Sequence, residues 1–286
     1  MPASGTSSAY VVLDQAFRLE SDHPEVTEHV AAVLHRFAVP ADDVAGVRAT
    51  TYRVEHVAQP EPHQPPYRVL VGDEVWYADR DPGLLAEYLL WHVAQTALTG
   101  AHSSVVVHAG SVVTPAGTGV LLPSASGSGK TTLTAGLVLA GCGFLSDEAA
   151  VYDVAGLARR YPRPLNLKPG SPLLDRAAVA AAVRRVGTTS HLDPEALRPG
   201  SVPVEPAPTG LVVVPRYRPD GEPAVEPVPA AEAVVELVTQ VMNRPVLSTG
   251  GFQVLAETVR GAVAYRTTYR TLDEGVEVVL DLAGMG

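Results

Sequence analysis

The sequence predicts an α/β fold preceded by a small α+β segment. From residue 104 onward, short apolar or β-branched runs alternate with stretches whose apolar residues recur at helical spacing, a pattern typical of α/β layers. Residues 1–100 carry a more mixed pattern of strand-like and helix-like runs. Hydrophobic residues make up 46% of the 286 residues and charged ones 18%, so a well-filled core is expected. We therefore treat 1–100 as one segment and 101–286 as the core.

The N-terminal segment is expected to contain a few short elements around a Pro-rich loop at residues 59–66. A hairpin is predicted around Gly72-Asp73. The helices are predicted because their apolar residues recur at helical spacing. Tyr88 and Trp91 lie in the more apolar helix and are expected in the core. The expected elements are a strand at 10–13, a helix at 24–37 with Asp22 as its N-cap, a hairpin at 67–77 and a helix at 84–98.

The core segment is expected to alternate strands with helices. Its middle part, residues 158–209, is rich in Pro, Arg and Ala and is predicted to hold at most one helix, at 174–186. The expected strands are 105–107, 111–113, 119–122, 143–145, 150–153, 211–214 and 263–269, and the expected helices are 130–140, 230–242 and 272–283.

The composition excludes several classes of protein. The formal net charge is −10, whereas a non-specific nucleic-acid binder needs a basic face. No apolar run approaches the roughly 18 residues that a bilayer-spanning helix needs, and the first residues have no secretory signal pattern. The single cysteine, Cys142, cannot form an internal disulfide. We expect a cytoplasmic protein with neither nucleic acid nor a membrane as its partner.

The sharpest motif is LLPSASGSGKTTL, at residues 121–133. An apolar strand leads into a loop of small residues, then Gly-Lys-Thr, then a helix, which is the pattern of a phosphate-binding loop. Small residues let backbone N–H groups close on phosphate oxygens, and the helix start presents its positive end. Ser124 stands where the pattern has glycine. The predicted ATP-binding residues are Ser126, Gly127, Ser128, Gly129, Lys130, Thr131 and Thr132.

Within that loop, Lys130 would contact the outer phosphates as a flexible point charge, and the Thr131 hydroxyl would ligate Mg²⁺. The alternative is an ordinary Gly/Ser-rich turn between a strand and a helix. A dinucleotide-binding fold is disfavoured, because no acidic residue ends a second strand in the expected way.

Two adjacent carboxylates, Asp147 and Glu148, follow the next predicted strand. One carboxylate can hold Mg²⁺ together with Thr131 while the other accepts the proton of an attacking hydroxyl. The alternative is a solvated acidic turn. His108 ends a predicted strand that should neighbour the strand of the phosphate loop, although a lone histidine is more often a core or surface group.

Arginine is far more frequent than lysine in this chain. Only two lysines occur, Lys130 and Lys168, among 21 lysines and arginines. Four cations crowd into residues 159–168, where prolines favour an extended course. Arg159 and Arg160 are expected to pair with acidic neighbours at the surface. The candidates for binding phosphate or substrate are Arg163, Lys168 and Arg216.

VHAG, GVLLPSASGSGKTTL and AGCGFLSDEAAVYD together resemble the catalytic core of HPr kinase/phosphorylase. They are closer still to HPr-kinase-related proteins of bacterial biosynthetic clusters, among them kinases of ribosomally made peptides. The resemblance is specific over residues 104–154 and looser over 159–283, and residues 1–100 resemble the small N-terminal part of such proteins. It implies a P-loop kinase core of the HPr kinase/PEP carboxykinase type. The catalytic residues that it implies are His108, Lys130, Asp147 and Glu148.

The chain departs from that family at two points. Glu148 replaces the second aspartate of the family's pair, and the later glutamate-arginine-glycine signature has no clear match. HPr is therefore not the expected acceptor, and the reverse phosphorolysis is not expected either.

The expected activity is transfer of the γ-phosphoryl of Mg-ATP to a hydroxyl, most simply a Ser or Thr of a peptide or small protein. Two alternatives stay open: a kinase of a small biosynthetic intermediate, and a nucleotide-gated ATPase or binding module without transfer. The expected cofactors are ATP and Mg²⁺. The sequence leaves open whether the chain acts alone or as a homo-oligomer.

Overall fold

The computed structural model describes residues 6–44, 48–124 and 128–285. The chain divides into two compact units. Unit 1 comprises Met1–Ala101 together with Arg184–His191, and unit 2 comprises His102–Val183 together with Leu192–Gly286. The return of the chain to unit 1 at Arg184–His191 has no counterpart in the division at residue 100 that the sequence suggested.

Unit 1 is built on a six-stranded sheet of order β3-β1-β2-β4-β5-β6. β2 and β4 run parallel, whereas the β1–β2, β1–β3, β4–β5 and β5–β6 pairs are antiparallel. Its elements are β1 (Thr6–Val12), β2 (Gln15–Ser21), α1 (Pro24–Leu34), β3 (Ala38–Val39), β4 (Ala49–His56), β5 (Tyr67–Val71), β6 (Glu74–Asp79), α2 (Pro82–Gly100), β14 (Arg184–Val186) and β15 (Thr189–Leu192), with short 3-10 turns at His35–Phe37 and Ala41–Val44.

Helix α2 contacts both the six-stranded sheet and strand β14 of unit 1. Asp81 caps it by accepting hydrogen bonds from the backbone N–H groups of Gly83 and Leu84, and Pro82 occupies the first turn, where no intrahelical donor is needed. The Glu87 carboxylate accepts hydrogen bonds from the backbone N–H and the hydroxyl of Thr188. These bonds attach the β14–β15 hairpin to unit 1 although it lies far away in the sequence.

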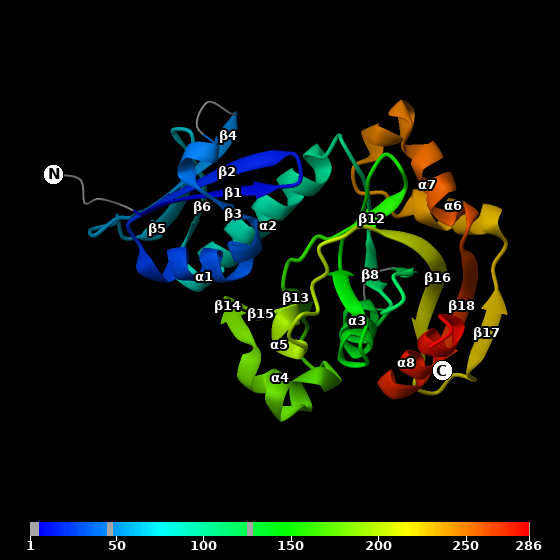
Figure 1. Ribbon diagram of the computed structural model, residues 1–286. Helices are drawn as coiled ribbons and strands as arrows, with labels where there is room; N and C mark the ends of the chain where they lie inside the picture. The colour runs from blue at the N-terminus through cyan, green and yellow to red at the C-terminus, as the bar shows by residue number, and fades with distance from the viewer. Residues whose placement is uncertain (1–5, 45–47, 125–127, 286) are drawn as a thin grey trace. The chain divides into compact units, whose positions relative to one another are not determined.

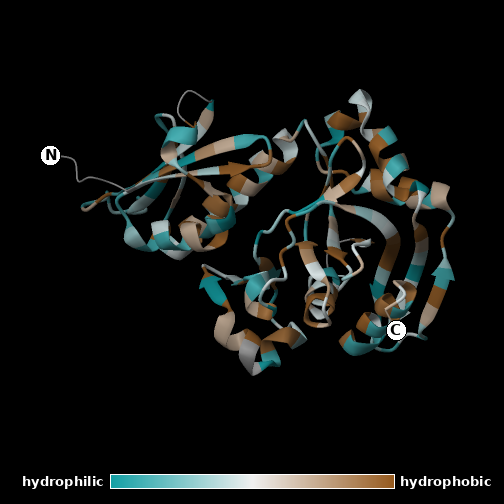
Figure 2. Ribbon diagram, viewed as in Figure 1, coloured by the Kyte–Doolittle hydropathy of each residue, from teal (hydrophilic) through white to brown (hydrophobic). Residues whose placement is uncertain are grey.

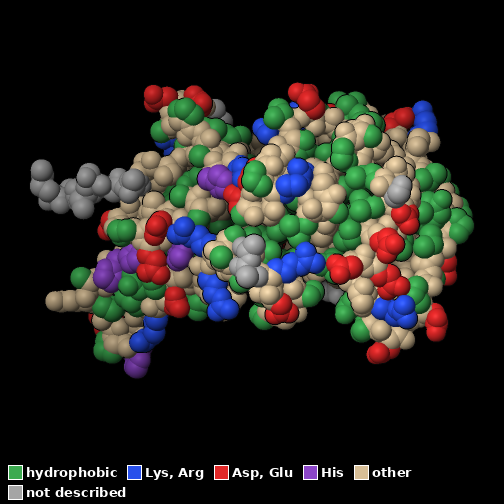
Figure 3. All heavy atoms as spheres, turned by 60° about the horizontal axis from the view of Figure 1, so that its bottom comes forward, with side chains coloured by type: hydrophobic (Ala, Val, Ile, Leu, Met, Phe, Trp, Pro, Cys, Tyr) green, Lys and Arg blue, Asp and Glu red, His purple; other side chains and the backbone are tan. Residues whose placement is uncertain are grey.

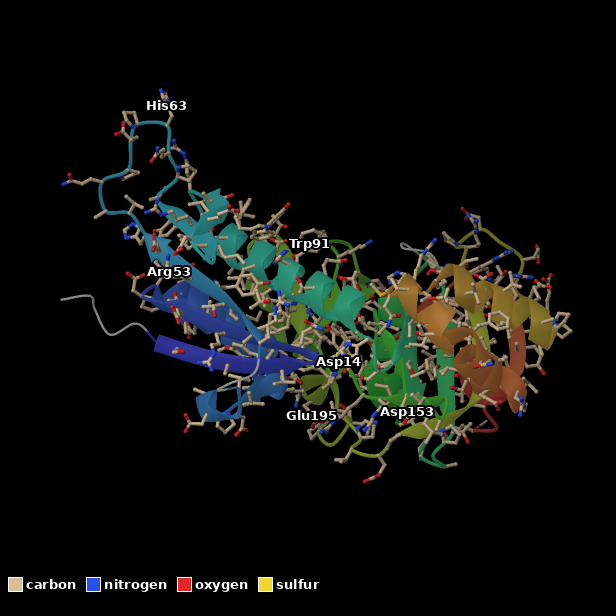
Figure 4. The ribbon with its side chains drawn as sticks, turned by 90° about the horizontal axis from the view of Figure 1, so that it is seen from above. Asp14, Arg53, His63, Trp91, Asp153 and Glu195 are labelled. Atoms are coloured by element: carbon tan, nitrogen blue, oxygen red, sulfur yellow. The ribbon has the colours of Figure 1, made fainter. Side chains whose placement is uncertain are left out.

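Two expectations for unit 1 are wrong. The N-cap residue of α1 is His23 rather than Asp22, and it makes no side-chain cap hydrogen bond. Tyr88 and Trp91 are 43% and 49% exposed rather than buried, and Figure 4 shows Trp91 on the outside of its helix. Because α2 buries Leu85, Leu89 and Val93 along another stripe, its two aromatic residues remain near the surface.

Unit 2 contains a nine-stranded sheet whose central strand is β16. β9 and β18 both run parallel to β16, and β8 runs antiparallel to β9. The elements are β7 (Val105–Val107), β8 (Ala109–Val113), β9 (Gly119–Pro123), α3 (Lys130–Leu139), β10 (Gly143–Ser146), β11 (Ala150–Tyr152), β12 (Leu157–Arg159), β13 (Leu165–Leu167), α4 (Ala177–Ala182), α5 (Pro194–Leu197), β16 (Ala207–Tyr217), β17 (Ala224–Pro227), α6 (Ala230–Thr239), α7 (Gly251–Arg260), β18 (Val263–Tyr269) and α8 (Leu272–Leu282), with 3-10 turns at Pro172–Asp175 and Arg244–Thr249.

Helices cover both faces of the large sheet. Leu211 and Val213 of β16 pack in the core beneath α3 and α8, whereas Val212 packs in the core beneath α6 and α7. Successive side chains of a strand point to opposite faces, so one apolar strand serves both cores. The pairs α3–α8 and α6–α7 can be followed in Figure 1, and their hydropathy in Figure 2.

Only the middle of the helix predicted at 174–186 is helical, and a second short helix, α5, follows in the stretch where at most one was expected. The chain instead forms a 3-10 turn, the short helix α4 and the strand β14. The β-branched ends of Val183-Arg184-Arg185-Val186 favour an extended backbone, and Gly187 with φ of 58° turns the chain into β15. Helix α7 was not predicted at all, although Val254, Leu255 and Val259 follow a helical spacing.

The predicted α/β class is confirmed at the level of a mixed α/β fold with several sheets. Across the described ranges, no helix combines the length and apolarity needed to cross a bilayer. Acidic and basic side chains are interspersed on the face shown in Figure 3, and the described residues of that face form no broad basic patch.

Candidate functional site

The start of α3 lies directly after the loop that follows β9. Gly129 is its N-cap residue, with φ of 88°, and no side chain of the described residues caps the helix. The first N–H groups of a helix without such a cap are available to an anion. Ser126 and Gly127 lie outside the described residues. Ser128 lies within hydrogen-bond distance of Ser124, 2.6 Å between the two Oγ atoms, and Ser124 has no positive φ, so the serine at the pattern's first position costs no backbone strain there.

The Lys130 side chain is buried and extends toward Ser124, which directly follows β9. Its Nζ atom donates to the backbone oxygen of Ser124 at 3.0 Å and lies 2.9 Å from Nε2 of His108. Burial, assisted by the charge of Lys168, lowers the pKa of Lys130 to about 8 against the opposing pull of the acidic pair. Gly110 gives the side chain its space, because a Cβ there would lie 3.2 Å from Cγ of Lys130.

His108 lies between β7 and β8 and connects the lysine to the acidic pair. β7 pairs with β11, whereas β8, which begins at the next residue, pairs with β9; the strand that His108 ends is therefore not the neighbour of β9 that was expected. Nδ1 lies 3.1 Å from the backbone oxygen of Glu148, which can only accept. The neutral ring with its proton on Nδ1 therefore satisfies both contacts, and burial together with the nearby Lys130 lowers the pKa of His108.

The two adjacent carboxylates differ in environment. Asp147 is 5% exposed and accepts hydrogen bonds from the Thr131 hydroxyl and from the backbone N–H of Asn166. Burial, followed by repulsion from Glu148, raises the pKa of Asp147 to about 7. The Glu148 side chain is 42% exposed, and its Oε2 lies 3.7 Å from Nη1 of Arg163. One carboxylate is thus enclosed beside the helix start, and the other is open to solvent.

These groups border a cavity of about 310 Å³, which we name the phosphate pocket. Thr132 also borders it, and its Oγ1 lies 3.4 Å from the hydroxyl of Ser171. The lining residues are His108, Gly129, Lys130, Thr131, Thr132, Asp147, Glu148 and the run Asn166–Pro172.

The structure brings most of the predicted site residues together, with one clear exception. Lys168 lines the phosphate pocket, and Arg163 joins the site through Glu148. Arg216 is exposed at the end of β16 and does not line the pocket. Arg159 pairs with Asp153 at 3.8 Å near the surface, as expected.

Three contributors were missed in the sequence. Asn166 holds Asp147 through its backbone, and Ser171 faces Thr132. The Ser146 hydroxyl accepts from the backbone N–H groups of Glu148 and Ala149, at 3.4 and 3.0 Å, and so shapes the turn that carries the acidic pair. The Pro-Gly-Ser-Pro run at 169–172 is the only local signal that marks this wall of the pocket as a turn.

The donors in this pocket fit Mg²⁺ bound together with a nucleotide. Magnesium takes one or two carboxylates and completes its shell with water and substrate phosphates. Thr131 and Asp147 already meet through a hydrogen bond, and the ionised form of Asp147 is disfavoured by burial and by Glu148, so a cation there would relieve the repulsion. Among the described residues, no cluster of three or more His, Cys, Asp or Glu could hold a metal ion without other ligands.

Comparison with known proteins does not assign this site. The chain matches no protein-family model, and no curated protein matches it significantly.

Proposed function

We propose that this chain is an ATP-dependent phosphotransferase of the HPr-kinase-like type, which moves the γ-phosphoryl of Mg-ATP to a hydroxyl. One observation carries the proposal. A buried lysine, a hydroxyl beside a buried carboxylate and an open carboxylate converge on one pocket at an uncapped helix start. Phosphoryl transfer needs phosphate binding, a metal ligand and an acceptor for the hydroxyl proton, and little else from the protein.

The phosphates would lie at the start of α3. The N–H groups there and the ammonium of Lys130 supply positive charge, and Lys168 adds a second cation to the lining of the pocket. His108 and the backbone oxygen of Ser124 hold that ammonium in place before a nucleotide arrives. Since the neutral His108 ring contributes no charge of its own, it acts as a positioning residue.

The environments of the two carboxylates divide their roles. Asp147 contacts Thr131, so these two residues would hold a magnesium ion, which would supply positive charge to the phosphoryl oxygens. Glu148 is the more exposed carboxylate and borders the same pocket, so an incoming hydroxyl can reach it. Arg163 restrains Glu148 through an ion pair, which orients the base.

The transfer step conserves atoms and electrons in a simple way. The acceptor oxygen forms a bond to the γ-phosphorus, the bond from that phosphorus to the bridging β–γ oxygen breaks, and ADP leaves with the electron pair. Glu148 takes the proton that the acceptor hydroxyl loses. A serine or threonine of a peptide or small protein is the proposed acceptor.

The proposal is tested with radiolabelled ATP, magnesium and a panel of peptide and small-molecule hydroxyls, scoring both transfer and release of free phosphate. Glu148→Gln should slow transfer at least about 100-fold while nucleotide affinity stays magnesium-dependent. Asp147→Asn should abolish both transfer and the magnesium dependence of nucleotide affinity. Glu277→Gln, at an exposed position of α8, is the matched control and should behave as wild type.

Three results would count against the proposal. Absence of nucleotide binding in the wild type would end it. Phosphate release without transfer to any acceptor would favour an ATPase or a nucleotide-gated module. Transfer by Glu148→Gln at the wild-type rate would remove the assigned base.

A further inference from the structure

A second cavity of about 410 Å³ adjoins the phosphate pocket at the start of α3. Tyr217 at the end of β16 and Tyr269 at the end of β18 line it, so we name it the tyrosine pocket. Its volume lies within the range of small-molecule sites. Gly129 and Thr132 line both cavities, as does Gly170 on the opposite loop. A ligand at the helix start can therefore extend from one cavity into the other.

The tyrosines pack closely against Gly129, the N-cap residue of α3. A Cβ on Gly129 would lie 3.3 Å from Oη of Tyr269 and 3.4 Å from Cβ of Tyr217. Their ring centroids are 6.1 Å apart with planes tilted by 48°. With Leu133 and Leu272 they form an apolar and aromatic wall, which suits a flat heteroaromatic ring.

The Tyr269 hydroxyl has no hydrogen-bond partner among the described residues. The residue is 3% exposed, and its buried Oη atom has no hydrogen-bond partner in the part of the chain that the structure describes. Buried hydroxyls are seldom left unsatisfied because that costs the lost hydration of the group. A ligand with polar atoms close to Gly129 would supply the missing partner.

We propose that the tyrosine pocket binds the nucleoside part of the nucleotide, its base and ribose, while the phosphate pocket takes the phosphates and the acceptor. This inference rests on the proposed function, since it needs a nucleoside triphosphate at the start of α3. The lining residues indicate which end of the nucleotide lies in which pocket. Thr131, Asp147 and Glu148 line only the phosphate pocket, so the transferring end lies there and the other end of the nucleotide leaves past Gly129 and Thr132.

The acceptor is the competing occupant of the tyrosine pocket. Its hydroxyl must reach the acidic pair, and neither Asp147 nor Glu148 borders this cavity. An ion pair of Arg176 with Asp273, at 3.5 Å, stands at the border instead. Its two exposed side chains offer hydrogen bonds to ribose hydroxyls or to the edge of a base, and neither lines the phosphate pocket, where the γ-phosphoryl would lie.

The test compares two ligands that differ only in the nucleoside. Isothermal titration calorimetry on the full chain measures the affinity for magnesium ATP and for magnesium tripolyphosphate. Tyr217→Ala should weaken ATP binding about tenfold and leave tripolyphosphate binding within about twofold. Tyr217→Phe, which keeps the ring, should restore ATP affinity, and Tyr269→Phe should weaken ATP alone. Tyr88→Ala in unit 1 is the matched control, because Tyr88 and Tyr217 are similarly exposed at 43% and 47%.

The outcomes separate this inference from the proposed function. Selective loss of ATP affinity in Tyr217→Ala supports the nucleoside pocket. Equal effects on both ligands, or no effect on either, overturn it, and so does a raised KM for the acceptor at unchanged ATP affinity. A wild-type chain that binds ATP no more tightly than tripolyphosphate overturns the nucleoside pocket alone. A wild-type chain that binds neither ligand overturns both proposals.

Discussion

Asp147→Asn is expected to stabilise the nucleotide-free protein at alkaline pH more than at acidic pH. Burial, followed by repulsion from Glu148, raises the pKa of Asp147 from 3.8 to about 7. Between these two values the folded chain holds a proton that the unfolded chain has lost. The stability that this proton confers is complete below 3.8 and is lost as the pH rises through about 7. The amide variant has no such titration.

The size of the effect follows from the two pKa values. Between about pH 5 and about pH 8.5, the folded carboxyl passes from almost fully protonated to almost fully ionised, whereas the unfolded carboxyl is ionised throughout. The linkage relation then gives an upper limit of about 2.7 kcal/mol for the change in the variant's relative stability. The measured value should be smaller, because the variant also loses the attraction between the carboxylate and the Lys130 ammonium; we expect about 1.5–2.5 kcal/mol.

Urea unfolding at these two pH values measures the difference. Trp76 and Trp91, the only tryptophans, both belong to unit 1, so their fluorescence follows a unit that does not contain Asp147. Far-ultraviolet circular dichroism is therefore the required signal. Asp220→Asn, at an exposed carboxylate, is the control for the chemical change. A relative stability of Asp147→Asn that is equal at both pH values would refute the argument that burial holds the proton on this carboxyl.

Two further predictions concern the surroundings of Lys130. Gly110→Ala should cost about 1–3 kcal/mol in urea unfolding and weaken ATP binding, because its Cβ would meet Oγ1 of Thr134 at 2.5 Å and Cγ of Lys130 at 3.2 Å. Thr134→Ala in the same chain should restore stability, whereas Gly261→Ala, whose Cβ meets no atom within 4 Å, should change little. At about pH 9, calorimetry in two buffers should detect uptake of nearly one proton on ATP binding, since phosphates favour the charged form of a lysine whose pKa is about 8. Lys130→Met should abolish that uptake; an uptake that persists would contradict the assignment.

The parts of the site that lie within one short stretch of chain can be predicted from the sequence. A strand, a run of small residues and Gly-Lys-Thr before a helix place Lys130 and Thr131 through bonded geometry alone. Asp147 and Glu148 follow a strand that pairs with the neighbour of β9, so strand order brings them to the same pocket. These expectations needed only the alternation of strands and helices.

The remaining parts depend on contacts between distant segments. Asn166 and Ser171 reach the site because the extended chain after β12 crosses it, and no periodic pattern encodes that course. Tyr269 reads as one aromatic residue of an alternating strand, and its position beside Gly129 follows from the parallel pairing of β16 with β18. The burial predicted for Trp91 is wrong for a different reason. An apolar helix predicts burial, but only one stripe of α2 faces the sheet.

The choice of lysine at position 130 in an arginine-rich chain has a physical reason in this structure. The side chain is buried and ends between two single acceptors, the Ser124 oxygen and Nε2 of His108, where a compact ammonium fits and a planar guanidinium with its five donors does not. A guanidinium would also stay charged in this enclosed position, whereas the pKa of Lys130 falls to about 8.

Lys168 lines the same pocket and contributes to the fall in the pKa of Lys130. The charges of the two lysines therefore repel each other at this pocket, and the negative charge of a bound polyphosphate would offset that repulsion. Lys168→Met should therefore raise the pKa of Lys130 while weakening polyphosphate binding, and an unchanged polyphosphate affinity would show that only Lys130 serves the phosphates.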